Sequence, residues 1–163
     1  MRTNIFLAAI TTLVLSSCGS SERQADEQKD SVSSIHSDSK FIIKASNMMY
    51  LTINPDSSLV ANQPDPTKAE VFQRVDLGNG KVAIKASTGR FLSNNLSKNS
   101  TVDVIREKPS GWEEFEVIAL DPISVNIRSF DGKYVSADIG SDGKVTANRD
   151  AASTWETFSL EPK

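Results

Sequence analysis

The segment Val82-Ala83-Ile84-Lys85-Ala86-Ser87 decides the fold, because the chain carries two further versions of it. The first version is Phe41-Ile42-Ile43-Lys44-Ala45-Ser46, and the third is Val125-Asn126-Ile127-Arg128-Ser129-Phe130. An aromatic residue and an aliphatic residue follow each version: Tyr50-Leu51, Phe91-Leu92 and Tyr134-Val135. Each unit then ends on a phenylalanine, at Phe72, Phe115 and Phe158. The chain therefore contains three repeats of about forty residues.

The pattern inside each repeat is that of β-strands. Apolar residues alternate with other residues around Ile43 and again around Ile84, which is the period of two expected for a strand. Turn pairs such as Thr88-Gly89, Asp131-Gly132 and Asp142-Gly143 separate the short strands. No window has the spacing of an amphipathic helix, so we predict an all-β protein.

Three repeats that cannot bury their own apolar faces must share one core, and closing the sheet removes exposed edges. We therefore predict a β-trefoil with pseudo-threefold symmetry over residues 40–163, with repeats at about 40–78, 79–121 and 122–163. A sandwich would not explain the threefold repeat, and propellers usually have four or more blades. The predicted core consists of Ile43, Ile84, Ile127, Leu51, Leu92, Val135, Phe72, Phe115 and Phe158.

The N-terminal segment has the features of an export signal. Arg2 precedes an apolar run from Ile5 to Leu15, which is shorter than the roughly 20 residues of a membrane-spanning helix. Leu15-Ser16-Ser17-Cys18 resembles the lipobox of bacterial lipoproteins, and an ordinary cleavage site is the alternative. The resemblance implies a signal peptide at 1–17 and attachment of lipid, including palmitate, to Cys18. Gly19 after the cysteine implies sorting to the outer membrane of a bacterial envelope.

The segment that follows is polar and rich in serine and acidic residues. Such a composition cannot bury enough apolar surface to offset the entropy of ordering, so we predict a disordered tether over 18–39. The lipid and the tether together would hold the folded domain near the membrane.

The composition of residues 40–163 excludes several classes of function. This part has 15 Lys and Arg against 16 Asp and Glu, so it lacks the basic surface of a nucleic-acid binder. It contains no histidine and no cysteine, which argues against a metal site and against Ser-His or Cys-His catalysis. A pair of catalytic carboxylates stays open in principle. We expect a monomeric protein that is not an enzyme and needs no cofactor.

The ends of the second and third repeats carry a family resemblance. Trp112-Glu113-Glu114-Phe115 and Trp155-Glu156-Thr157-Phe158, with Asp131-Gly132-Lys133-Tyr134 and the segment 143–149, resemble the fascin-like branch of the β-trefoil superfamily. The first repeat departs from this pattern, because Ala69 stands in place of the tryptophan. The resemblance implies a trefoil fold and, for bacterial members found outside the cell, sugar binding.

Residues that recur in every repeat favour a structural role over a binding role. We expect Tyr50, Phe91 and Tyr134, and also Trp112 and Trp155, to pack in the core and not to serve as platforms for sugar rings. The recurring basic residues Lys44, Lys85 and Arg128 are expected to form ion pairs with the recurring acids Glu70, Glu113 and Glu156. A polar pocket lined by these charges is the alternative.

Residues that break the repeat are the candidates for ligand contacts. Amides and carboxylates form hydrogen bonds with vicinal hydroxyls, and these side chains gather in an insertion of the second repeat and around a hairpin of the third. The predicted sugar contacts are Asn94, Asn95, Asp138, Asp142, Asn148 and Arg149. The same residues would also suit solvated turns.

We therefore expect a non-catalytic surface module that binds glycan. The alternative is a protein-interaction or structural subunit whose partner is an envelope or host protein. A solvent-exposed tryptophan beside Asp138 or Asn148 would favour glycan, whereas two buried tryptophans would favour a protein partner.

Overall fold

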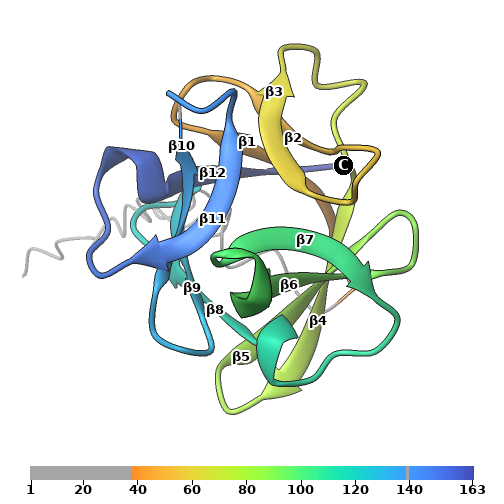
Figure 1. Ribbon diagram of the computed structural model, residues 1–163. Coiled ribbons are helices and arrows are strands. Elements are labelled where there is room, and N and C mark those ends of the chain that lie inside the picture. The colour runs from red at the N-terminus through yellow and green to blue at the C-terminus, as the bar shows by residue number, and fades with distance from the viewer. Residues whose placement is uncertain (1–37, 139) are drawn as a thin grey trace, which may run out of the picture.

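The computed structural model describes residues 38–138 and 140–163, which form one antiparallel assembly of twelve strands (Figure 1). The predicted signal peptide, Cys18 and nearly all of the predicted tether lie outside the described residues. The strands of the first repeat are β1 (Lys40–Ala45), β2 (Tyr50–Ile53), β3 (Leu59–Gln63) and β4 (Phe72–Gly78). Those of the second are β5 (Lys81–Ala86), β6 (Phe91–Asn95), β7 (Thr101–Arg106) and β8 (Phe115–Ala119). Those of the third are β9 (Ser124–Ser129), β10 (Tyr134–Asp138), β11 (Lys144–Arg149) and β12 (Thr157–Pro162).

The first and last strands of each repeat close into a six-stranded barrel. β1 pairs with β4, β4 with β5, β5 with β8, β8 with β9 and β9 with β12. The ring closes where β12 returns to β1, with Phe41 opposite Pro162 and Ala45 opposite Phe158. The β-trefoil prediction is confirmed, because this closed ring repeats one four-stranded unit three times.

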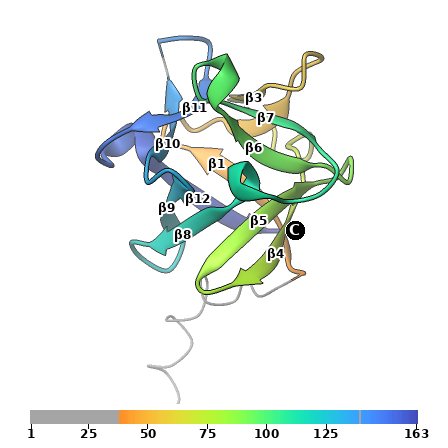
Figure 2. The ribbon, with the colours of Figure 1, turned by 60° about the horizontal axis from the view of Figure 1, so that its bottom comes forward.

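The middle strands of each repeat form three hairpins that cap one end of the barrel. β2 pairs with β3, β6 with β7 and β10 with β11. The hairpins join one another near the threefold axis, where Val60 lies opposite Lys144, Thr101 opposite Thr146 and Ser58 opposite Asp103. Figure 2 shows this cap at the top of the view and the β4–β5 hairpin at the bottom.

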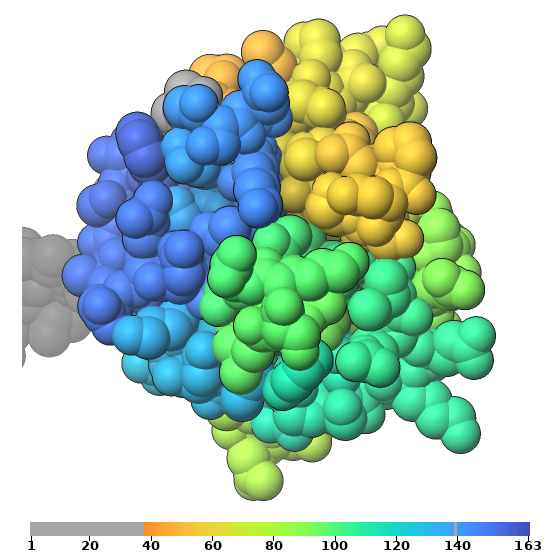
Figure 3. Space-filling view, viewed as in Figure 1, coloured from red at the N-terminus to blue at the C-terminus, as the bar shows by residue number. Residues whose placement is uncertain are grey.

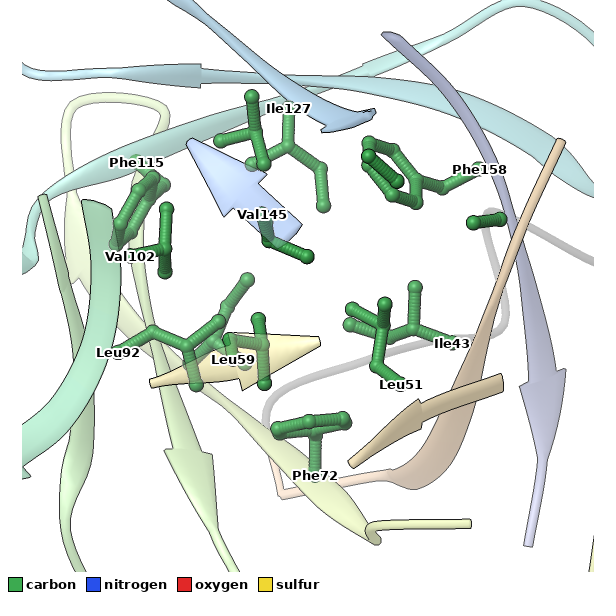
Figure 4. Packing of buried hydrophobic residues seen from close by; sticks show 14 of the residues in the cluster. Ile43, Leu51, Leu59, Phe72, Leu92, Val102, Phe115, Ile127, Val145 and Phe158 are labelled. Atoms are coloured by element: carbon green, nitrogen blue, oxygen red, sulfur yellow. The ribbon is translucent and has the colours of Figure 1, made fainter. Parts of the chain in front are cut away.

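Side chains from all three repeats converge in one core. Figure 4 shows Ile43, Phe72, Phe115, Ile127 and Phe158 directed toward a common centre between barrel and cap. All nine predicted core residues belong to this cluster, so that prediction is confirmed. The alternation of side chains along each strand explains which residues enter the core. Phe41 and Ile43 face the core, whereas Ile42 between them joins a small outer cluster with Tyr50 and Ala69.

Short 3-10 turns are the helical elements among the described residues: η1 (Leu96–Lys98), η2 (Gly111–Glu113) and η3 (Thr154–Glu156). No helix of the described chain is long and apolar enough to span a membrane. The tryptophans lie in η2 and η3, immediately before β8 and β12. Side chains alternate between the two faces along a strand. Because Trp112 lies before β8, this alternation does not place it on the face opposite Phe115.

The end of the barrel opposite the cap receives both described ends of the chain. The Lys163 N–H donates to the Lys40 carbonyl at 3.0 Å, beside the start of β1. The turns after β4 and β8 occupy the equivalent positions in the other repeats. The cap and the chain ends therefore lie at opposite ends of the molecule.

Candidate functional site

The two predicted asparagines at the end of β6 are inside the cap. Asn94 is fully buried, and its Nδ2 donates to Ser129 Oγ at 3.2 Å and to Asp131 Oδ2 at 3.4 Å. It connects the second repeat to the first turn of the third. Neighbouring repeats therefore cover Asn94, and its predicted contact with a sugar stays a prediction.

Asn95 is also buried, and its polar neighbour is the buried Asp103. Its Nδ2 donates to Asp103 Oδ2 at 2.7 Å, and its Oδ1 accepts the Ser97 N–H at 3.1 Å. Asn95 thus holds Asp103 in place and begins η1. The structure therefore assigns the side chain of Asn95 to the buried Asp103 and to the start of η1, and its contact with a sugar stays a prediction.

The four candidates of the third repeat divide between the two ends of its hairpin. Asp138 and Asp142 lie in the β10–β11 turn, where Asp138 accepts the Gly140 N–H at 2.9 Å. Asn148 and Arg149 lie at the far end of β11. Arg149 Nε is 3.8 Å from Glu156 Oε1, and Asn148 Oδ1 accepts a hydrogen bond from Thr146. The structure does not bring these four residues into one site.

Asp142 does belong to a site that the sequence did not define. The three repeats meet on the cap side (Figure 3), and a depression of about 590 Å³ lies at the junction of the hairpins. We call this depression the axial basin. Its polar lining residues are Asn54, Asp56, Ser58, Asn62, Lys98, Asn99, Thr101, Asp103, Ser141, Asp142 and Lys144.

Asp103 is the distinctive residue of the axial basin. Its side chain is only 1% exposed, and its Oδ2 receives the bond from Asn95. Lys98 Nζ lies 3.9 Å from Oδ2, whereas the buried Oδ1 has no hydrogen-bond partner among the described residues. A buried carboxylate oxygen without a donor is costly. Asp103 thus brings to the lining of the basin a buried carboxylate with one oxygen that lacks a donor among the described residues.

The charges of the axial basin are nearly balanced. Asp56 contributes a negative charge, and hydrogen bonds from Ser58 together with the charge of Lys98 hold its pKa below the usual value. Lys98 and Lys144 bring positive charge to the same depression. The basin therefore offers both donors and acceptors. No group of three or more His, Cys, Asp or Glu within the described ranges could hold a metal ion.

The tryptophans are more exposed than predicted. Trp155 is 39% exposed and Trp112 is half-buried, so the prediction that both belong to the core is wrong. Trp112 lines a groove of about 700 Å³ with Arg106 and Phe130, and the Arg106 guanidinium lies 5.8 Å from the Trp112 ring centre. Trp155 lies in η3, beside the Glu156 that pairs with Arg149.

Two of the three recurring basic residues contact aromatic residues in place of the predicted acids, and Arg128 pairs with Glu116 in place of the predicted glutamates. Lys44 Nζ lies 5.4 Å from the centre of the Tyr50 ring, and Lys85 Nζ lies 5.8 Å from that of Phe91. These contacts are favourable. Tyr50 and Phe91 are buried as predicted, although both lie outside the main core. Tyr134 is only half-buried, so the prediction is wrong there.

The recurring acids also have other partners than predicted. Glu113 accepts the N–H and the hydroxyl of Ser110 at 2.9 and 2.8 Å, and Glu156 accepts both groups of Ser153 at 2.8 Å. Glu70 accepts the Ser87 N–H at 2.7 Å. The predicted ion pairs are wrong, because the glutamates fix the 3-10 turns and a β-turn.

Comparisons with known proteins agree with this architecture. No family model matches the chain, and no curated protein matches it by sequence. Among solved structures, the designed threefold-symmetric protein ThreeFoil matches 75% of this chain and 97% of its own at a TM-score of 0.66 and 15% identity. The BEL β-trefoil matches 78% of this chain and 95% of its own at a TM-score of 0.65 and 15% identity.

Two other similar structures are larger than this chain. The Polyporus squamosus lectin, solved with the epitope Neu5Aca2-6Galb1-4GlcNAc, has a TM-score of 0.65 and 11% identity over 77% of this chain and 49% of the lectin. An endo-β-galactosidase of Clostridium perfringens has a TM-score of 0.64 and 11% identity over 77% of this chain and 32% of the enzyme. Fold and comparisons together define the class: the chain is a β-trefoil protein.

Proposed function

We propose that this protein is a non-catalytic module that binds glycan in the axial basin. The observation that carries the proposal is the buried Asp103, whose Oδ1 has no donor among the described residues and which lines the basin. A sugar hydroxyl can donate to this oxygen and at the same time accept from another group. Lys98 and Lys144 supply such donors in the same depression.

The polar lining suits a ligand that carries several hydroxyls. Specific sites fix a ligand with a few well-placed polar groups, and the basin combines carboxylates, ammonium groups and the amides of Asn54, Asn62 and Asn99. Two larger proteins of similar fold support the ligand class, since one is a lectin solved with a saccharide epitope and the other is an endo-β-galactosidase. Their identity of 11% limits this support to analogy.

The cellular setting belongs to the same proposal. The lipobox-like Leu15-Ser16-Ser17-Cys18 supports a lipid anchor in the bacterial outer membrane, and the Trp-Glu-x-Phe segments support a fascin-like trefoil. The described chain ends lie opposite the cap. An anchored molecule would therefore direct the axial basin away from the point where the tether enters the domain.

A protein partner is the second candidate, and a specific observation favours it. Leu77, Leu120 and Ile123 are 38, 52 and 56% exposed. Leu77 lies at the end of β4, whereas Leu120 and Ile123 lie in the turn after β8, and both segments are at the end of the barrel opposite the cap. Exposed apolar residues can form part of a protein interface.

The test is a glycan array probed with the full-length protein in detergent. We expect binding to a limited set of saccharides, and Asp103→Asn should weaken it by about tenfold, the effect of losing one hydrogen bond to a charged group. Asp150→Asn is the matched control, because Asp150 is exposed outside the basin and pairs with Lys133. The bound saccharides should be recovered intact, as expected of a protein without catalytic activity.

Two results would overturn the proposal. The absence of binding to any saccharide, together with recovery of a specific protein by crosslinking on intact cells, would favour the second candidate. Equal affinity of Asp103→Asn and the unmodified protein, with both folded by circular dichroism, would place the glycan outside the axial basin.

A further inference from the structure

The barrel has three equivalent junctions between repeats, and each places three residues side by side. At each junction the central residue directly follows the closing phenylalanine of a repeat, and its neighbours come from the first strands of two repeats. The three sets are Lys40–Gln73–Lys85, Lys81–Glu116–Arg128 and Ser124–Ser159–Lys44. The differences between these sets reveal a site.

The second junction shows how two cations hold a carboxylate on this surface. Glu116 Oε2 lies 2.5 Å from Arg128 Nη2 and 3.8 Å from Lys81 Nζ. The hydrogen bond from Arg128 lowers the pKa of Glu116 below its usual value. The site is therefore saturated by a side chain of the protein itself.

The first junction keeps both cations but lacks the carboxylate. Gln73 stands where the second junction has Glu116, and its Nε2 donates to Asp38 Oδ1 at 3.0 Å. Neither Lys40 nor Lys85 has an ion pair with a carboxylate of residues 38–138 or 140–163. The third junction has a single cation, Lys44, so it offers no such pair.

A third lysine and a depression complete the first junction. Lys163 lines a depression of about 500 Å³ together with Lys40 and Lys85, and we call it the lysine pocket. Two carboxylates bind other residues at its edge: Asp38 binds Gln73, and Glu70 binds the Ser87 N–H. Both stay beyond ion-pair distance from the three ammonium groups. Lys163 Nζ donates to the Pro66 carbonyl at 3.2 Å and Lys85 Nζ lies over the Phe91 ring, so neither contact neutralises the positive charge.

We propose that the lysine pocket binds the carboxylate of an acidic saccharide between Lys40 and Lys85, in the position that Glu116 takes at the second junction. Besides charge, the pocket offers the apolar surface of Val71 and Ala86 and the hydroxyl of Ser87. A sugar ring has polar edges and an apolar face, and this mixed lining matches both. The pocket shares no residue with the axial basin, so this second site does not depend on the glycan proposed there.

The experiment measures binding of glucuronate and of glucose to the full-length protein in detergent, at low salt, by saturation-transfer NMR. Glucuronate should bind at least about tenfold more tightly than glucose. Its carboxylate would lie between Lys40 and Lys85, as the Glu116 carboxylate lies between Lys81 and Arg128 at the second junction. Lys85→Gln should weaken glucuronate binding by about tenfold, and Lys44→Gln at the third junction is the matched control that should not. Gln73→Glu should abolish binding, because it rebuilds the occupied second junction.

Several results would overturn the proposal. Equal binding of glucose and glucuronate would remove the role of the carboxylate. Binding that survives both Lys85→Gln and Gln73→Glu would place the ligand elsewhere. In a third outcome, acetate or inorganic phosphate competes as well as glucuronate at the same concentration. That result would show that the pocket binds any small anion, and it would contradict the saccharide part of the proposal.

Discussion

Gly143 shows how much of this fold depends on one residue at the hairpin junction. Its φ is +75°, and a Cβ at this position would lie 2.3 Å from the Ala61 carbonyl oxygen. The Ala61 N–H also donates to the Gly143 carbonyl at 2.7 Å. The close approach joins the third repeat to the first beside the axial basin, and it requires a residue without a side chain.

We expect Gly143→Ala to destabilise the protein by at least about 3 kcal/mol, because strain in the left-handed region adds to a backbone clash. Gly132→Ala is the control. Gly132 has a similar φ of +84° but open space around it, so that substitution should cost only about 1–2 kcal/mol. Urea unfolding measures both, and equal losses would mean that the contact with Ala61 contributes nothing.

Single residues also set the limit of what the sequence could predict. The pair Asp142-Gly143 was readable as a turn, but its contact with Ala61 spans two repeats and leaves no local pattern. Asn94 looks like part of a polar surface insertion, yet adjacent repeats bury it. Asp103 was missed because an acid between Val102 and Val104 has the pattern of an exposed strand position. Its burial comes from the neighbouring hairpins.

At the scale of elements, the 3-10 turns before β8 and β12 depend on a short motif. In each, a serine lies three residues before a glutamate, and its N–H and hydroxyl donate to that carboxylate, as in a capping box. The motif is visible as Ser110-Gly111-Trp112-Glu113 and Ser153-Thr154-Trp155-Glu156. The motif was therefore predictable from the sequence. The threefold recurrence of basic and acidic residues, taken alone, had indicated ion pairs.

The buried Glu156 predicts how stability depends on pH. Burial disfavours its charged form, but the hydroxyl and N–H of Ser153 and the charge of Arg149 outweigh burial, so its pKa is lower than usual. A carboxyl with a lowered pKa stabilises the fold above its unfolded pKa of about 4.3, and this contribution is lost as the pH falls through the folded pKa.

We therefore expect the free energy of unfolding to fall from about pH 5 downward, and to fall less steeply in Glu156→Gln. Urea unfolding at a series of pH values gives both slopes. Identical slopes for the variant and the unmodified protein would show that Glu156 contributes no pH dependence in this range.

At the scale of the whole molecule, the fold was predictable because its symmetry is written in the sequence. Three copies of one strand pattern, each ending on phenylalanine, require three similar units around one core, and Phe72, Phe115 and Phe158 occupy equivalent places in it. The candidate site was less predictable, because the axial basin forms between repeats. No single stretch of sequence contains its lining.

The lipid anchor is a prediction about the whole protein in its cell. We expect an alkyne analogue of palmitate to label the protein, and Cys18→Ala to abolish the label, because the acyl chains need this thiol. Ser17→Ala retains a small residue before the cysteine and should keep the label. Equal labelling of the Cys18→Ala variant would contradict attachment at this residue.

The pairing of β1 with β12 imposes an order of events on a newly made chain. The ribosome synthesises β1 early and β12 late, and Phe41 cannot pair with Pro162 until all the residues between them have been synthesised. Contacts between residues so distant in sequence slow folding. Until β12 arrives, the apolar Ile42 and Ile43 stay on an unpaired edge, where another chain could pair with them. Protection of β1 by a holding chaperone during this interval would prevent aggregation.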